Sequence, residues 1–375
     1  MKWMHLADLH LGRSCDGVSL KEDQEAVLRE IVGIAQAERP DGVIIAGDVF
    51  DRSLPPESAV TMLDAFILAL RAVCPVFAIA GNHDSGERLA YMSRMLEKLG
   101  VYFCGQLSGP LAPVTVGDTD VYLLPYMHPA QVRALGLVPP ETPARMEDTV
   151  RVLLEGRVRG NAPRTILAAH LFVTWHGEKP EECQSEREPV GTLEDVDGAL
   201  FDAFDYVALG HIHGAQKVGR ETMRYAGTPL MYSFSEEHHR KSVCIYDPDA
   251  AEKVRLIPLR AGRKMRTVRG LMAELLDPAF DKGDHADFVL AMLQDKELQP
   301  DAQARLGSIY DNVRVTYENR AREGENAQWQ ASEELLNDPL ALFEAFFRQK
   351  KDREMNDKEK NVVTELLNLA EEDAK

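Results

Sequence analysis

Five short clusters of metal-ligand residues, each placed directly after an apolar run, constrain this chain more than any other feature of its sequence. The apolar runs have the composition and length of buried strands and occupy residues 2–7, 41–46, 75–80, 164–169 and 206–209. The clusters are Asp8-Leu9-His10, Gly47-Asp48-Val49-Phe50-Asp51, Gly81-Asn82-His83-Asp84, Ala169-His170 and Gly210-His211-Ile212-His213. Ligands of open α/β sheets bind beyond the carboxyl ends of the strands, so we expect the clusters to meet there.

The side chains of these clusters are suited to two divalent cations. Together they supply two carboxylates, one amide oxygen and four or five imidazoles, which is a ligand set for borderline-hard ions such as Mn²⁺ or Fe²⁺. Two such ions can hold the attacking and leaving oxygens of a phosphoryl transfer. A single Asp or His after a strand is most often an ordinary loop residue, but five such positions in order favour an enzyme that cuts phosphate esters.

The same motifs resemble those of the calcineurin-like metallophosphoesterase superfamily, and within it those of the SbcD-type nuclease subunits of bacterial double-strand-break repair. The resemblance covers most of the chain. It implies an α/β fold, namely a two-sheet β-sandwich flanked by helices, with a small α/β cap domain and a C-terminal helical tail. The matching stretches are Asp8-Leu9-His10-Leu11-Gly12, Ala46-Gly47-Asp48-Val49-Phe50-Asp51, Ala80-Gly81-Asn82-His83-Asp84-Ser85, Ala208-Leu209-Gly210-His211-Ile212-His213 and Tyr225-Ala226-Gly227-Thr228-Pro229.

The resemblance implies two Mn²⁺ ions per chain, with other divalent ions possible, and a hydroxide bridging them as the nucleophile. Asp48 would bridge the two ions, because a carboxylate has two oxygens with lone pairs and an imidazole cannot span two cations in this way. The remaining ligands would be Asp8, His10 and His213 for one ion, and Asn82, His170 and His211 for the other.

Two further residues are implied to act in catalysis without binding metal. His83 would face the scissile phosphate, where an imidazolium stabilises developing charge and protonates the leaving oxygen. Asp84 is expected to orient the ring of His83. His5 alternates within the first strand and is predicted to be a hydrogen-bonded core residue. The histidines predicted to lie in loops away from metal are His128, His176, His238 and His239.

The activity implied is that of a DNA nuclease with 3′–5′ exonuclease action on double strands and endonuclease action on single strands and hairpins. Such an enzyme serves DNA repair, recombination and replication. A calcineurin-like phosphatase or cyclic-nucleotide phosphodiesterase is an alternative, although a small substrate needs neither a cap nor a tail. A non-catalytic scaffold of the same fold is a second alternative, although such a chain should lack at least one ligand.

The charge distribution is uneven. The net charge of −18 argues against indiscriminate DNA binding. Residues 176–197 hold eight acidic and two basic residues and should rim the site, where they could bind cations, exclude a strand or form a solvated loop. Residues 252–269 hold seven basic residues and one acidic, and they form either a contact to the DNA backbone or a solvated loop. The candidate DNA contacts are Arg52, which follows Asp51 as in protein phosphatases, and Arg263, Lys264 and Arg266.

Four parts are predicted: a phosphoesterase core (1–262), a DNA-capping domain (263–320), a polar linker (321–331) and a helical tail (332–375). Apolar periodicity predicts helices around residues 27–35 and 62–70 of the core. Further core strands are expected at 121–124, 223–226, 242–246 and 254–258. In the cap we expect strands at 266–269 and 313–317 and helices near 270–276 and 285–295.

The tail is predicted to form two short amphipathic helices. The first begins at Asp338-Pro339, and the second begins at Asn356, with Glu359 completing a capping box. The resemblance implies that such a tail grips the coiled-coil base of an SMC-like ABC ATPase, SbcC, within a heterotetramer that contains a homodimer of this subunit. Packing of the tail on the core is the alternative. Its apolar stripes are Phe343, Phe346 and Phe347, and Val363, Leu366 and Leu367.

The sequence predicts a cytoplasmic protein. No run approaches eighteen apolar residues and no signal sequence is recognised, so no membrane association is expected. The five cysteines are scattered without a C-x-x-C pair, which is typical of a reducing compartment, and Cys74 and Cys244 are expected in the core. No G-x-x-x-x-G-K-[ST] loop occurs, so no ATP site is expected in this chain.

Overall fold

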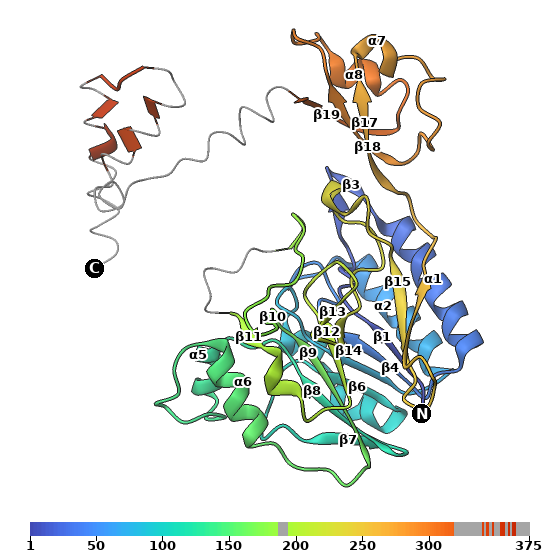
Figure 1. Ribbon diagram of the computed structural model, residues 1–375, viewed down its shortest axis with the longest axis vertical. Helices are drawn as coiled ribbons and strands as arrows, with labels where there is room; N and C mark the ends of the chain where they lie inside the picture. The colour runs from blue at the N-terminus through green and yellow to red at the C-terminus, as the bar shows by residue number, and fades with distance from the viewer. Residues whose placement is uncertain are drawn as a thin grey trace. The chain divides into compact units, whose positions relative to one another are not determined.

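Figure 1 shows a computed structural model of the chain, which forms two compact units, Met1–Val315 and Thr316–Lys375. The described residues are 1–186, 194–318, 340, 343–344, 347–348, 353–356, 359–360 and 362–364. Within this part of the chain, every helix is too short or too polar to span a membrane.

The first unit is built on two six-stranded sheets packed face to face, which confirms the predicted sandwich. The first sheet has the order β16 (Val254–Pro258), β15 (Ser242–Tyr246), β1 (Trp3–Leu6), β4 (Gly42–Ala46), β5 (Val76–Ile79) and β6 (Val101–Cys104). The second has the order β13 (Gln216–Val218), β14 (Arg220–Tyr225), β12 (Tyr206–Gly210), β9 (Arg164–His170), β8 (Thr119–Leu124) and β7 (Pro113–Val116). All five strands predicted to precede ligand clusters are therefore present.

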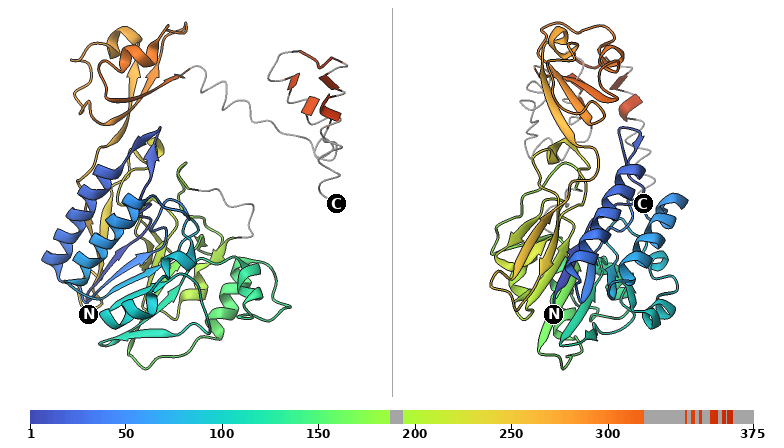
Figure 2. Two further views of the ribbon diagram at one scale, coloured as in Figure 1. Left: turned by 180° about the vertical axis from the view of Figure 1, so that it is seen from behind. Right: turned by 90° about the vertical axis from the view of Figure 1, so that its right-hand side faces the viewer.

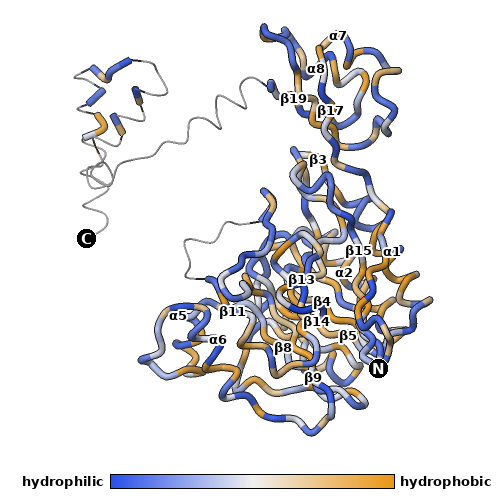
Figure 3. The backbone as a smooth tube through the Cα atoms, viewed as in Figure 1, coloured by the Kyte–Doolittle hydropathy of each residue, from blue (hydrophilic) through white to orange (hydrophobic). Residues whose placement is uncertain are grey.

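Helices cover the outer face of each sheet, which explains why the inner strands are apolar along their whole length (Figures 2 and 3). Against the first sheet pack α1 (Lys21–Glu38) and α2 (Glu57–Arg71), at the predicted positions. Against the second pack α5 (Pro129–Ala134) and α6 (Met146–Glu155). The short elements are β2 (Ser14–Cys15), β3 (Val18–Ser19), α3 (Gly86–Leu89), α4 (Ser93–Leu96), η1 (Glu97–Leu99), β10 (Val173–Thr174), β11 (Val196–Asp197), η2 (Gly198–Phe201) and η3 (Phe234–Glu236).

Strand direction places the ligand clusters together. Strands β1, β4, β5 and β6 are parallel, and so are β8, β9, β12 and β14. The carboxyl ends of the parallel strands in each sheet therefore lie at one edge. His5 links β1 to β12 across the sandwich. Its ring is hydrogen-bonded through Nδ1 to the Tyr206 hydroxyl (3.0 Å) and through Nε2 to the Leu209 carbonyl (3.1 Å). Burial lowers the pKa of His5 to about 3, so it is the neutral core residue that the sequence predicted.

A three-stranded sheet follows residue 262, with β18 (Phe288–Leu293) between β17 (Met265–Gly270) and β19 (Asn312–Tyr317). It carries α7 (Met272–Leu275) and α8 (Ala302–Leu306), and the predicted strands and first helix are confirmed. The helix predicted near 285–295 is wrong, because this segment forms β18. Its six apolar residues have no polar positions to reveal a period, and their short length suits a buried strand better than a helix.

In the second unit, the described residues include the predicted capping box. The Asn356 N–H donates to the Glu359 carboxylate (2.9 Å), and the Glu359 N–H donates to the Asn356 side-chain oxygen (3.0 Å). Phe343 and Val362 are exposed, at 40% and 56%. The linker 321–331 and the positions Asp338, Pro339, Phe346, Leu366 and Leu367 lie outside the described residues.

Candidate metal centre

The predicted ligands converge at the carboxyl ends of five strands. Asp8 follows β1, Asp48 follows β4, Asn82 follows β5, His170 ends β9 and His211 follows β12. Asn82 is half-buried, and the other six predicted ligands are at most 8% exposed. A buried group of this kind needs partners for its polar atoms, so we next describe the distances among them.

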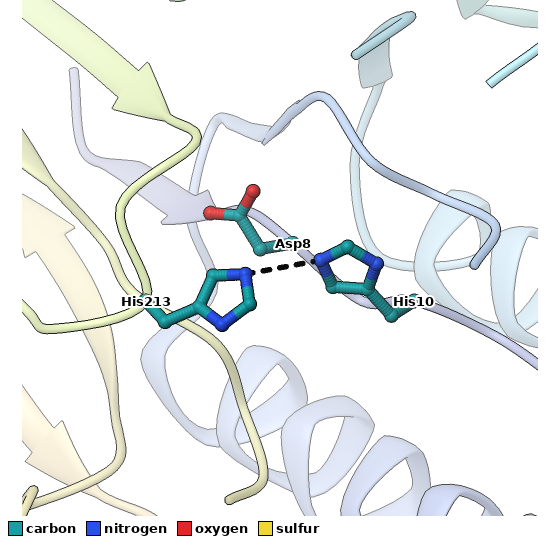
Figure 4. A group of neighbouring side chains, drawn as sticks. All are labelled: Asp8, His10 and His213. Atoms are coloured by element: carbon teal, nitrogen blue, oxygen red, sulfur yellow. Dashed lines mark hydrogen bonds between the residues drawn. The ribbon is translucent and has the colours of Figure 1, made fainter. Parts of the chain in front are cut away.

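One side of the centre is formed by Asp8, His10 and His213, whose ligand atoms lie within 4.8 Å of one another (Figure 4). The Nε2 atoms of His10 and His213 are 3.2 Å apart. Burial lowers the pKa of His10 well below its usual value, so its ring is neutral and retains a lone pair. Two nitrogens that share one cation at about 2.1 Å lie close to this distance apart, so this side fits a bound cation.

The other side is formed by Asn82, His170 and His211. The side-chain oxygen of Asn82 lies 2.9 Å from Nε2 of His170 and 3.2 Å from Nδ1 of His211. The Nδ1 atom of His170 is 2.9 Å from the Ala46 carbonyl and donates its hydrogen there, which directs Nε2 towards Asn82. Three ligand atoms of the predicted second set therefore meet at one point.

Asp48 lies between the two sides. Its Oδ2 atom is 3.7 Å from Nε2 of His10 and 3.5 Å from Nε2 of His170. Its Oδ1 atom accepts a hydrogen bond from the backbone N–H of His83 (2.9 Å). One carboxylate oxygen thus faces both ligand groups, which is the position that a bridging ligand requires.

The electrostatics of the centre favour cations. Burial opposes ionisation of Asp48, but the neighbouring positive charge of His170 outweighs it and lowers the pKa of this carboxyl. Burial would lower the pKa of His170, and the Asp48 charge instead raises it to about 9. Burial raises the pKa of Asp8 and lowers that of His211 to about 3. Without metal, the positive charge of His170 therefore balances the Asp48 carboxylate, and a cation bound there would replace the His170 proton.

The backbone at these residues is strained, because four of the predicted ligands have a positive φ without being glycine. The angles are 54° at Asp8, 44° at His10, 47° at Asp48 and 109° at His211. Glycine is required where the backbone packs closely against a ligand: a Cβ atom at Gly47 would overlap the His170 ring. Such conformations cost about 1–3 kcal/mol each and persist where the surrounding structure holds them.

His83 points into the centre, but Asp84 does not orient it. The Asp84 carboxylate accepts hydrogen bonds from the backbone N–H groups of Val49 (3.0 Å), Phe50 (2.9 Å) and Gly81 (2.9 Å). The Nδ1 atom of His83 instead lies 2.9 Å from the Asp51 carbonyl. The predicted role of Asp84 is therefore corrected: its oxygens are used to join the loops after β4 and β5.

The Nε2 atom of His83 lies 4.0 Å from Oδ2 of Asp48. His83 also groups with His10 and Asp48 as a geometrically possible set of ligands. Its position therefore allows both a catalytic role and metal binding.

Two of the four candidate DNA contacts are occupied elsewhere. The guanidinium of Arg263 donates to the buried carboxylate of Asp23 (2.6 and 3.1 Å), and that of Arg266 pairs with Asp281 and Asp287. Both arginines hold the structure around β17 together, and their contact with DNA stays a prediction. Lys264 is exposed, and Arg52 is 73% exposed beside Asp51.

Several residues that support the ligands were not predicted from the sequence. The side-chain amide of Gln24 donates to the His10 carbonyl (2.7 Å), and the Tyr232 hydroxyl donates to the Leu9 carbonyl. Ser185 and Glu186, from the acidic segment 176–197, contact His213. This contact confirms that the segment reaches the centre. No spacing in the sequence distinguishes these residues from ordinary polar positions.

Comparison with known proteins agrees with this geometry. A sequence model of the calcineurin-like phosphoesterases matches residues 1–215, and one described as a type 5 capsule protein repressor C-terminal domain (SbcD_C) matches residues 261–351. The SbcD component of the SbcCD nuclease of Staphylococcus saprophyticus is 32% identical over 323 residues, which cover 84% of this chain and 83% of the relative. The chain belongs to the SbcD-type calcineurin-like phosphoesterases. The phosphoesterase match of this SbcD-type chain contains every predicted metal ligand, and the predicted family and fold are confirmed.

Proposed function

We propose that this SbcD-type chain is the nuclease subunit of an SbcCD-type complex. It is a metal-dependent hydrolase that acts on DNA phosphodiesters. The observation that carries the proposal is the position of Asp48, with one oxygen within 4 Å of histidine nitrogens on both sides of the centre. A small phosphatase would share this centre, but the C-terminal match beyond residue 261 favours the nuclease.

The residues present would hold two Mn²⁺ ions. Asp8, His10 and His213 would bind one ion, Asn82, His170 and His211 the other, and Asp48 both. When bound, a pair of such ions polarises the phosphodiester and supplies the nucleophile. Nδ1–H of His83 donates to the Asp51 carbonyl, which aims Nε2 at the centre. A proton carried at Nε2 can then pass to the leaving oxygen of the DNA.

The direct test is a cleavage assay on linear double-stranded, single-stranded and hairpin DNA, with Mn²⁺ or with EDTA, and with or without an SMC-like ATPase. We expect Mn²⁺-dependent 3′–5′ shortening of double strands, and internal cuts in single strands and hairpins. Hydrolysis of small phosphodiesters without any DNA cleavage would favour the phosphodiesterase alternative. No hydrolysis with any divalent ion would favour the scaffold alternative.

Lys264 is the candidate DNA contact of the run 263–266 whose side chain is exposed. Lys264→Glu should weaken binding to all DNA sequences and reduce the slope of log affinity against log salt by about 1, because one phosphate contact is lost. Hydrolysis of bis-p-nitrophenyl phosphate should persist. Arg263→Glu is the contrasting variant: it leaves Asp23 without its partner and should lower stability by about 2 kcal/mol. Equal loss of DNA binding and small-diester hydrolysis in Lys264→Glu would contradict the contact.

The tail is proposed to bind an SMC-like ABC ATPase of the SbcC type. Its described part exposes Phe343 and Val362, and its second helix has its own capping box. Exposed apolar side chains on short amphipathic helices suit docking in a partner's groove. The ATPase would supply the nucleotide site that the sequence of this chain lacks.

Deletion of residues 332–375 tests the tail. We expect the truncated chain to keep its metal and its single-strand cleavage but no longer to co-purify with the ATPase, because the docking helices are gone. The milder double variant Phe343→Asp, Val363→Asp should weaken co-purification in the full chain. Aggregation of the truncated chain, or a large fall in its melting temperature, would show that the tail packs on the core.

An apolar surface supports the proposed homodimer. Arg88 reaches the carbonyl of Ser53, which precedes α2 (3.4 Å), and Arg71 at the end of α2 reaches the Leu99 carbonyl, so residues 88–99 approach both ends of the segment 53–71. Large apolar side chains along both are exposed, and a two-fold dimer would bury the same surface of each copy. They are Val60 (49%), Leu68 (72%), Tyr91 (75%), Met92 (47%), Met95 (60%) and Leu99 (62%).

The double variant Leu68→Glu, Met95→Glu should convert a dimer into monomers, because it places charges on the surface that the two copies would share. Light scattering during size-exclusion chromatography measures the mass. The control is Leu256→Glu, at a residue 39% exposed on the edge strand β16. A wild-type chain that is monomeric at micromolar concentration would contradict this interface.

The cellular setting follows from the same proposal. All five cysteines lie in the described part of the chain and are free thiols, which agrees with a reducing cytoplasm. A nuclease of this type would act there on broken or hairpin DNA during repair, recombination and replication.

A further inference from the structure

The ring nitrogen of His213 that lies away from His10, Nδ1, contacts the hydroxyl of Ser185, which in turn contacts the carboxylate of Glu236. This Nδ1 atom is 2.7 Å from Oγ of Ser185, and the same Oγ is 2.6 Å from Oε1 of Glu236. Ser185 belongs to the acidic segment 176–197, and Glu236 lies in η3, which follows the Tyr225–Pro229 motif. Glu236, Ser185 and His213 thus form a hydrogen-bond network that ends at a predicted metal ligand.

A buried ion pair fixes which atoms donate and which accept in this hydrogen-bond network. Glu236 is fully buried, and its Oε2 accepts from the ammonium of Lys241. A carboxylate paired with a buried ammonium is an acceptor only. The single hydroxyl hydrogen of Ser185 must therefore point to Glu236.

The protonation of His213 follows from this arrangement. Because Oγ of Ser185 donates to Glu236, it can only accept from His213, so the ring proton is at Nδ1. The lone pair is then at Nε2, which lies 3.2 Å from Nε2 of His10 on the same side of the centre. A histidine ligand commonly has its other ring nitrogen held in this way.

The acidic segment also holds the main chain of His213. The His213 N–H donates to Oε1 of Glu186, and the His213 carbonyl accepts from Lys241 (3.2 Å). The Cys183 N–H donates to the other oxygen of Glu186 (2.7 Å). Cys183, Glu186 and His213 could be read as a third cation site. Their ligand atoms are already used in hydrogen bonds to one another and to Ser185, so they serve as a support.

We propose that Ser185, oriented by Glu236, is a positioning residue that fixes the ring and tautomer of His213 for cation binding. In this proposal, the part of the acidic segment that contacts the metal centre orients the ligand His213. It does not itself bind the metal. The inference rests on the proposed metal centre. It does not require that the substrate is DNA.

Ser185→Ala removes the hydroxyl that accepts from Nδ1–H while leaving every metal ligand in place. We expect one of the two Mn²⁺ sites to bind about 10–100-fold more weakly and the other to be unchanged, which is the usual effect of removing such a partner. Mn²⁺ binding is measured by electron paramagnetic resonance of the free ion and by calorimetry. The melting temperature in EDTA measures folding without metal.

Two matched variants separate positioning from charge. Glu181→Gln removes an exposed carboxylate from the same segment and should leave both affinities unchanged. Ser185→Thr restores a hydroxyl and should recover most of the lost affinity. Unchanged Mn²⁺ binding in Ser185→Ala would overturn the proposal. Equal weakening of both sites together with a lower melting temperature in EDTA would also overturn it, because Ser185 would then be a general structural residue.

The cleavage assay distinguishes failure of this inference from failure of the proposed function. In Ser185→Ala, the Mn²⁺ concentration for half-maximal cleavage should rise by the same factor as the dissociation constant. The rate at saturating Mn²⁺ should return close to that of the wild type. If the wild type binds two ions but cleaves no DNA, the proposed substrate is wrong, and selective weakening of one site by Ser185→Ala still supports the positioning role.

Discussion

Asp48→Ala is expected to remove both cations together and to abolish DNA cleavage. The Oδ2 atom of Asp48 lies 3.5 Å from the His170 nitrogen on one side of the centre and 3.7 Å from the His10 nitrogen on the other. Each remaining ligand belongs to one side only, so no other single substitution should affect both sites equally. Metal per chain is measured by mass spectrometry after desalting, and cleavage is measured on hairpin DNA with saturating Mn²⁺.

Two further variants are controls for Asp48→Ala. Asp48→Asn keeps an oxygen that can accept from the His83 N–H, so it separates loss of the charge from collapse of the loop. Asp249→Asn changes a carboxylate that is 62% exposed and should have no effect on metal content. Retention of two metal ions per chain by Asp48→Ala would show that Asp48 is not the bridge.

His83→Gln is expected to keep both metal ions while the cleavage rate falls by about 10²-fold or more, the contribution of a positioned acid. The ring is held through Nδ1 by the Asp51 carbonyl, with Nε2 directed at the centre and 4.0 Å from Asp48. Glutamine is close in size but has no titratable nitrogen, so it should bind DNA as the wild type does. The rate is measured at saturating DNA and saturating Mn²⁺.

The competing role for His83 is that of a ligand, which its grouping with His10 and Asp48 also allows. A ligand would be revealed by loss of one metal ion in His83→Gln and by recovery of the rate at high Mn²⁺. The exposed His128 provides the matched control: His128→Gln should change neither metal content nor rate.

The meeting of the metal ligands could be predicted because ligand and strand are adjacent in the sequence. Each apolar run fixes a buried parallel strand, and the next polar residue then has only the carboxyl edge of the sheet to occupy. This argument locates Asp8, Asp48 and His170 without any knowledge of side-chain direction. The same reasoning correctly placed His5 inside the sandwich, since it alternates with outward-facing residues in β1.

The features that the sequence did not reveal depend on partners that are far apart along the chain or on hydrogen-bond direction. Arg263 was predicted to bind phosphate because it stands in a basic run, but Asp23 satisfies it from α1. Asp84 was assigned to its neighbour His83, and three backbone N–H groups use its oxygens. Ser185 has no sequence signal at all, because its role depends on Glu236 in a separate loop.

The positive φ angles at Asp8, His10, Asp48 and His211 have an evolutionary consequence. Glycine adopts such angles without strain, but at Asp48 it would leave the buried charge of His170 without its partner. A library of this gene selected only for thermal stability should therefore accumulate glycine at His10 and His211 and drift towards inactive, more stable proteins. Selection for cleavage is then what retains these two histidines.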